Sequence, residues 1–203
     1  MRAVSEPDKA GYRPNRRVFW RAGLAAIGII AAVGSSAALL PTKMANWQVV
    51  RGRPVWTEVA WPFTIDQWGR GRAFHCRATD CGADTILFVR PKIGFCNCTT
   101  GVVDDEELDR VGDTDLVDGQ RRELGSGTAI AVRWMKGRSR GYSLQDHLFS
   151  IKSILSVAFN DRCDVIVATA VVSSDLPMAQ QPAVLEFLNS DMVMQWVELT
   201  LGL

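Results

Sequence analysis

The chain has 203 residues and a formal net charge of +1, because 23 Lys and Arg are nearly balanced by 22 Asp and Glu. This balance argues against a nucleic-acid partner, which would require a clear excess of basic residues. Without the N-terminal tail and the apolar segment that follows it, about 160 residues remain, which is enough for one domain with its own core and short for two.

An uncharged segment runs from Ala22 to Leu40 and follows a run of basic residues that ends at Arg21. As a helix rising about 1.5 Å per residue, it would be about 28 Å long, close to the thickness of the bilayer's hydrocarbon core. The basic residues place the N-terminus in the cytoplasm. We therefore expect a bacterial inner-membrane protein, with the four segments that follow. They are a cytoplasmic tail (1–17), a transmembrane helix or uncleaved signal anchor (18–40), a stalk (41–54) and a periplasmic domain (55–203).

The residues Arg16, Arg17 and Arg21 belong to the sequence Asn-Arg-Arg-Val-Phe-Trp-Arg. It resembles the bacterial twin-arginine export signal, in which any residue, a Phe, a large apolar residue and a basic residue follow paired arginines. Asn15 stands where that signal usually has Ser or Thr. Ordinary membrane insertion is the alternative route. The apolar run is longer than a usual signal core, which favours a retained anchor over a cleaved signal.

Short strands are predicted for the first part of the domain, because β-branched and aromatic residues cluster between turn formers. They cover residues 55–61, 73–77, 85–90 and 92–97. Pro91 is expected to separate the last two strands, and the four would form a small antiparallel meander.

A helix and a strand are predicted next. Asp104 and Glu107 have the spacing of a capping box, which indicates a short helix that ends near Gly112. Residues 128–135 have the pattern of a strand, and the basic sequence at 136–141 is expected to form a solvated turn.

Two helices and one strand are predicted for the rest of the chain. Residues 143–159 have apolar side chains at helical spacing, although part of this segment also fits a strand. Residues 164–172 form a continuous apolar run that suits the middle of a sheet. A final helix after Pro177 or Pro182 would present a broad apolar face. The fold class is therefore α+β: a mostly antiparallel β-sheet with covering helices on one side, preceded by one N-terminal transmembrane helix.

Five cysteines give the domain its clearest chemical signal. Periplasmic thiols are usually oxidised, so we expect two disulfides among Cys76, Cys81, Cys96 and Cys98. The predicted meander favours bridges from the Cys76 to Cys81 turn to the strand that holds Cys96 and Cys98, although sequence does not fix the connectivity. Cys163 is expected to be a buried free thiol.

A transition-metal site is the alternative interpretation of this cluster. His75, Cys76, Cys81, Cys96 and Cys98 provide five soft or borderline ligands within a short stretch. Their spacing departs from the paired knuckles of zinc sites, and no Cys-x-x-Cys pair opens a helix, as redox-active thiols require. No other cofactor is expected.

Two further patterns have ordinary explanations. The acidic residues in 113–118 lie near the spacing of a calcium loop but lack its closing Glu, and turn formation explains them. Ser143, Asp146 and His147 are residue types of a hydrolase, yet no nucleophile elbow is present.

No sequence motif names a reaction. We therefore expect a non-enzymatic function: a single-pass inner-membrane protein whose periplasmic domain is an interaction or accessory subunit of an envelope complex. Its partners would be the membrane and another envelope protein. The alternative is an exported metal-binding or thiol-redox protein that uses the cluster from His75 to Cys98.

Overall fold

The computed structural model describes residues 53–145 and 151–203. The expected cytoplasmic tail, the expected membrane span and nearly all of the stalk lie outside these ranges, as do Arg16, Arg17 and Arg21. Within the described residues, no helix combines the length and the hydrophobicity needed to cross a membrane.

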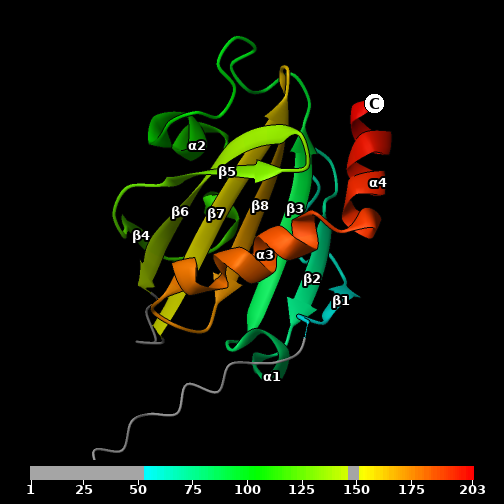
Figure 1. Cartoon of the computed structure of the whole chain (residues 1–203). Helices are drawn as coiled ribbons and strands as arrows, with labels where there is room; N and C mark the ends of the chain where they lie inside the picture. Colours follow the sequence, from blue (N-terminus) through cyan, green and yellow to red (C-terminus); the bar gives the residue numbers. More distant parts are fainter. Residues whose placement is uncertain (1–52, 146–150) are drawn as a thin grey trace, which may run out of the picture. The chain divides into compact units, whose positions relative to one another are not determined.

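Eight strands form one sheet, and neighbouring strands are antiparallel (Figure 1). Seven follow the order β1-β2-β3-β8-β7-β6-β4, while β5 pairs with β6 outside this path. The strands are β1 (Trp56–Val59), β2 (Arg72–Cys76), β3 (Thr85–Lys92), β4 (Gln120–Glu123), β5 (Thr128–Val132), β6 (Met135–Gln145), β7 (Ile151–Asp161) and β8 (Asp164–Val172).

Helices lie on both faces of the sheet. They are α1 (Ala78–Cys81), α2 (Asp105–Val111), the 3-10 turns η1 (Thr114–Leu116) and η2 (Pro177–Gln180), α3 (Gln181–Leu188) and α4 (Asp191–Leu201). The α+β class with a mostly antiparallel sheet is confirmed. The expectation that helices cover one side only is wrong, because α3 and α4 pack on one face and α2 packs on the other.

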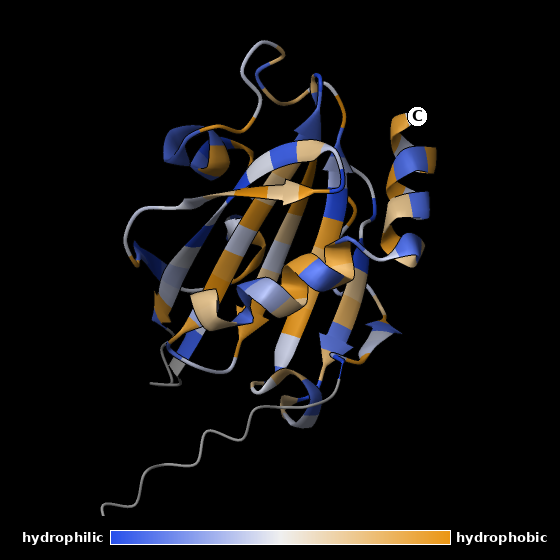
Figure 2. Ribbon diagram, viewed as in Figure 1, coloured by the Kyte–Doolittle hydropathy of each residue, from blue (hydrophilic) through white to orange (hydrophobic). Residues whose placement is uncertain are grey.

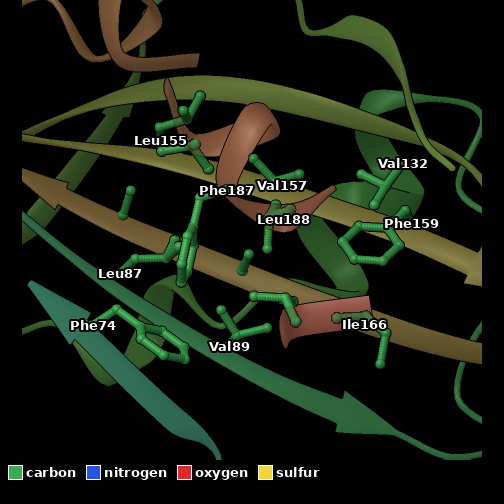
Figure 3. Packing of buried hydrophobic residues seen from close by; sticks show 14 of the residues in the cluster. Phe74, Leu87, Val89, Val132, Leu155, Val157, Phe159, Ile166, Phe187 and Leu188 are labelled. Atoms are coloured by element: carbon green, nitrogen blue, oxygen red, sulfur yellow. The ribbon is translucent and has the colours of Figure 1, made fainter. Parts of the chain in front are cut away.

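The main core lies between the sheet and α3 with α4 (Figure 3). Strand side chains alternate between faces, so Leu155, Val157 and Phe159 of β7 all point toward these helices. From the helix side, Phe187 and Leu188 of α3 fill the space above the strands. This packing buries the middle of the sheet on its first face, and Figure 2 shows that the strands behind α3 are largely apolar.

A second core lies on the opposite face, under α2. Leu108 and Val111 of α2 are fully buried against Val165 and Val167 of β8. Strand β8 lies between β3 and β7 and is covered on both faces, which explains its continuous apolar run and confirms the prediction for 164–172.

The predicted break at Pro91 is wrong, and residues 92–97 form no strand. Strand β3 runs through Pro91 to Lys92, paired with β8 along its whole length. The pairing of β3 with its other neighbour, β2, extends only as far as Val89. Among the described residues, no strand therefore lies on that side of Pro91. The missing N–H of a proline costs no ladder hydrogen bond there.

The expected basic turn at 136–141 is also wrong, because these residues lie inside β6. Arg138 and Arg140 alternate with Gly137, Ser139 and Gly141. The side of the strand that carries these three small residues faces the main core. At Gly137 an added Cβ would lie 2.0 Å from the carbonyl oxygen of Ala158 on β7. A strand whose inward positions are this small lacks the apolar alternation that marks strands in a sequence.

The helix predicted over residues 143–159 does not form. These residues supply the end of β6 and most of β7, with 146–150 outside the described ranges. Residues of β7 are buried on both faces, so its apolar side chains do not alternate with polar ones in the middle of the strand and also fit helical spacing. The single final helix is replaced by two, because the chain turns at Asn189 and Ser190 between α3 and α4.

Candidate functional site

Four of the five cysteines lie in two pairs at disulfide distance. Cys76 pairs with Cys81, and Cys98 pairs with Cys163, with Cα–Cα distances of 6.0 and 4.2 Å. Cys96 is the free cysteine, so the expectation of a free Cys163 is wrong. The two pairs lie at opposite ends of β3. Cys76 and Cys81 precede its first residue, and Cys98 belongs to the segment that follows its last residue. The expected bridges between these two regions are therefore absent from the described part of the chain.

The thiol of Cys96 is sheltered inside the second core. Its side chain is 6 % exposed, and Sγ donates to the backbone carbonyl of Arg162 at 3.2 Å. Burial, together with the nearby charges of Glu107 and Asp164, raises the pKa of Cys96 to about 11. The thiolate is the reactive form of cysteine, so this residue is chemically inert in the folded domain.

Cys96 is therefore expected to be the one thiol that reacts with maleimide, and only after denaturation. At pH 8 the folded domain should gain no label, and the urea-unfolded chain should gain one, because unfolding exposes the thiol and restores its ordinary pKa. Mass spectrometry under non-reducing conditions measures both states, and Cys96→Ala is the control that should gain none. Labelling of Cys98 or Cys163 in unreduced protein would contradict the observed pairing.

The five residues of the metal hypothesis do not come together. Nε2 of His75 contacts Oδ1 of Asp84 at 2.9 Å, and the sulfurs of Cys76, Cys81 and Cys98 are held in disulfides, which supply no thiolate ligand. Within residues 53–145 and 151–203, no group of three or more His, Cys, Asp or Glu side chains is arranged to hold a metal ion.

Asp113, considered above for calcium, instead belongs to a buried ionic cluster with Asp66, Arg90 and Lys92. Oδ1 of Asp113 lies 2.8 Å from Nη2 of Arg90 and 2.7 Å from Nζ of Lys92. Side chains of Arg90, Lys92 and Asp113 are each at most 6 % exposed. Asp66 adds a second carboxylate at 2.7 Å from Nη1 of Arg90. Burial opposes the charge of Asp66, but hydrogen bonds from Arg90 and from the Trp68 amide keep its pKa below the usual value.

This cluster, which we call the Asp113 cluster, fixes the segment after α2 to the sheet. Lys92 also donates to the carbonyl of Val111 at 2.6 Å, at the end of α2. Every charged group in the cluster has an opposite charge within contact distance, as burial requires. The geometry of the cluster is that of ion pairs that stabilise the fold.

The hydrolase pattern gains no support. Ser143 lies on β6 and donates to the carbonyl of Arg122 on β4 at 3.3 Å. Asp146 and His147 lie outside the described residues.

A second ionic contact joins α2 to β6. Asp105 in the first turn of α2 pairs with Arg138, and its carboxylate accepts the amide of Gly127 at 3.0 Å. One turn later, Asp109 pairs with Arg140 at 2.9 Å and accepts the hydroxyl of Tyr142. Burial and the carboxylate of Asp109 raise the pKa of Tyr142. Asp104 caps the helix by accepting the amide of Glu107 at 2.8 Å, which is one half of the predicted capping box. The carboxylate of Glu107 instead accepts the amide of Asn97 and pairs with Arg110.

Replacing Asp105 by Asn is expected to lower the free energy of unfolding at pH 7 by about 1 to 2 kcal/mol, because it weakens hydrogen bonds to a charged group that is 26 % exposed and thus partly screened. Hydrogen bonds from Arg138, with help from Gly127 and the charge of Arg140, hold the pKa of Asp105 below its ordinary value of 3.8. This stabilisation is therefore present above the ordinary pKa and is lost as pH falls through the lower pKa of the folded state.

Urea midpoints of Asp105→Asn and the unaltered chain should thus converge as the pH falls below 3.8 and through the lower pKa of the folded state. The matched control is Glu106→Gln in the same helical turn, whose carboxylate makes no ion pair with any described residue. A difference that persists unchanged in acid would contradict the assigned role of the Asp105 charge.

The outer side of α4 carries two exposed apolar side chains, Met192 and Leu199, which we call the α4 strip. Met192 is 45 % exposed and Leu199 is 83 % exposed, whereas Trp196 is partly buried and packs against the main core. The inner side of the helix is a separate set, because Val193 and Val197 are buried in the main core. An α-helix needs one apolar face to pack on its own domain, so the second face has no role in the described fold.

The turn between β5 and β6 lies beside α4 and presents Trp134, which is 54 % exposed. This turn is fastened to the α3–α4 junction, because the amide of Arg133 donates to Oδ1 of Asn189 at 2.8 Å. The guanidinium of Arg133 also pairs with Asp191 at the start of α4. A hollow of about 370 Å³ lies between the turn and α4, lined by Arg133, Trp134, Asp191, Met194, Gln195 and Glu198.

Sequence reasoning predicted the final helix but did not find this surface. The apolar residues of the α4 strip were assigned to one broad face of a single helix. The chain turns at Asn189 and Ser190 and begins a second helix, which buries Val193 and Val197 and leaves Met192 and Leu199 exposed.

No protein-family model, no curated protein and no solved structure matches this chain.

Proposed function

We propose that this chain is an exported, membrane-anchored protein whose folded domain acts as a non-enzymatic interaction subunit of an envelope complex. The observation that carries the proposal is the α4 strip, because Met192 and Leu199 are exposed while the inner side of the same helix packs on the core. Trp134, on the turn next to α4, is also exposed. Exposed apolar side chains of this size are typical of protein interaction sites.

The two disulfides support the export part of the proposal. Disulfides persist in the periplasm and are rare in the bacterial cytoplasm. The Arg-flanked apolar segment at 18–40 would supply the anchor. The charged clusters of the described domain pair internally, as structural ion pairs do, and so favour a binding role over catalysis.

A photo-crosslinking amino acid at position 199 of the full chain, expressed in a bacterial host membrane, tests the interaction. We expect an adduct of raised mass from this position. The control places the same probe at Ile65, which is 65 % exposed but lies on the loop between β1 and β2. Adducts from neither position, or equally from both, would refute a specific contact at α4.

Export is tested separately with an epitope tag fused after Leu203. Protease added to intact spheroplasts is expected to remove the tag. Protection of the tag until the cells are lysed would place the domain in the cytoplasm and overturn the location.

A further inference from the structure

We infer that the hollow between the β5–β6 turn and α4 receives an arginine side chain of the envelope partner. The inference deepens the proposed function and rests on it, because it names the side chain that the partner brings to α4.

Helices α3 and α4 carry acidic residues and no basic ones. Their charged residues are Glu186, Asp191 and Glu198, and no Lys or Arg follows position 162 of the sequence. Arginines from other parts of the domain balance two of the three. Arg53 contacts Glu186 at 2.8 Å and Arg133 pairs with Asp191, whereas Glu198 has no ion-pair partner among the described residues. This surface therefore lacks one positive charge, at Glu198.

The charge of Glu198 does not stabilise the helix that carries it. Glu198 lies in the last turn of α4, at the negative end of the helix dipole, where a carboxylate is unfavourable. Its side chain lines the hollow together with the exposed amide of Gln195 and the indole of Trp134. A cation from a partner would offset this charge.

The turn holds Trp134 in place beside the hollow. Arg133 and Trp134 form the two-residue connection between β5 and β6. Arg133 has a φ of 52°, in the left-handed region that favours glycine, and its contacts to Asn189 and Asp191 hold it there. The exposed indole is therefore already positioned before a partner binds, which lowers the entropy cost of the contact.

The walls of the hollow match the chemistry of a guanidinium group. A planar guanidinium can stack on an indole ring and donate two hydrogen bonds to one carboxylate, whereas a lysine ammonium lacks this paired geometry. Trp134 would supply the ring, Glu198 the carboxylate and Gln195 a further acceptor oxygen. Arg133 also lines the hollow, but Asp191 balances its charge.

The size of the hollow suits one long side chain. Its volume of about 370 Å³ is near the lower end of the range for ligand pockets, about 300 to 1,000 Å³. Arginine and tryptophan are also the residues that most often dominate the binding energy of protein interfaces. We therefore expect the hollow to hold one arginine within a larger contact on α4.

The experiment uses the full chain in a bacterial host membrane, with the photo-crosslinking amino acid at position 199. This position is one helical turn after Gln195 and therefore lies beside the hollow. We expect an adduct with one partner protein. Mass spectrometry identifies the cross-linked segment of that partner, which should contain an arginine.

Two variants test the walls of the hollow. Glu198→Gln and Trp134→Ala should each reduce the adduct about fivefold, because each removes one of the two groups that bind the guanidinium. The matched controls are Glu106→Gln, an exposed carboxylate on α2, and Ile65→Ala, an exposed apolar side chain on the β1–β2 loop, and neither should change the adduct. The Cys96 thiol should stay protected from maleimide in every variant, which shows that the fold is intact.

A charge exchange tests the ion pair directly. Glu198→Arg should abolish the adduct, because it places like charges together. Replacing the arginine of the partner by Glu should restore the adduct in this variant, because it reverses both members of the pair.

The outcomes separate the inference from the proposed function. An adduct that persists in Glu198→Gln or in Trp134→Ala would overturn the arginine while leaving an interaction subunit intact. A partner segment without arginine, a charge exchange that restores nothing, or an equal loss in either control would do the same. Absence of any adduct from position 199 would overturn the proposed function, and the inference with it.

Discussion

Replacing Asp113 by Asn is expected to lower the free energy of unfolding by about 3 to 5 kcal/mol, the range for removing one partner of a buried ion pair. The near-isosteric amide keeps the volume but removes the charge that faces Arg90 and Lys92, whose side chains are both 5 % exposed. Asp66 still contacts Arg90 at 2.7 Å. Lys92 keeps its hydrogen bonds to the carbonyls of Val111 and Gly112, but its buried ammonium group loses the carboxylate that it contacts.

Urea unfolding of the full chain in mild detergent measures this loss, with tryptophan fluorescence as the signal. Trp68 is a local reporter, since its ring lies 5.7 Å from Nζ of Lys92. Asp115→Asn is the matched control, because Asp115 lies two residues away in the same loop, is 86 % exposed and pairs with Arg121. Exposed pairs contribute little, so the control should lose less than about 1 kcal/mol. Similar losses for both variants would contradict the buried role of Asp113.

Local signals in the sequence predicted the elements that local interactions determine. Helix α2 follows from the capping pair Asp104 and Glu107, which the structure joins by a hydrogen bond within one turn. Strand β8 follows from its uninterrupted apolar run, because a strand buried on both faces has no polar side. Both predictions needed no knowledge of distant residues.

The predictions that failed depend on distant contacts. Strand β6 has glycines at inward positions because β7 approaches closely at Gly137 and η2 approaches closely at Gly141, and neither contact is visible in the sequence of β6 alone. The disulfide pairing was wrong for a related reason: β3 continues through Pro91 and carries the segment with Cys96 and Cys98 away from Cys76. The role of Asp113 was missed because Arg90, its partner, lies 23 residues earlier.

Removing the Cys98–Cys163 disulfide is expected to cost about 4 kcal/mol, whereas removing the Cys76–Cys81 disulfide should cost about 2 kcal/mol. The sequence separations are 65 and 5 residues, and a cross-link that closes a longer loop restricts the unfolded chain more. Each pair is replaced by two alanines, so that no new free thiol arises. Urea midpoints of the two double variants, measured without reductant, give the comparison.

The longer loop also contains more of the fold, which makes this comparison a test of topology as well as of pairing. Residues 98 to 163 enclose α2 and the strands β4 to β7, and Cys163 lies in the turn between β7 and β8. Without the Cys98–Cys163 disulfide, the unfolded chain is no longer restricted over the residues that form half of the strands. Without the Cys76–Cys81 disulfide, only the residues of α1 and its flanks lose a restriction. In the unaltered chain, a strong reductant should therefore produce a loss close to the sum of the two double variants, since the disulfides are far apart along β3. An equal loss for both variants, or a larger loss for Cys76 with Cys81, would show that Cys98 and Cys163 are not joined in the protein.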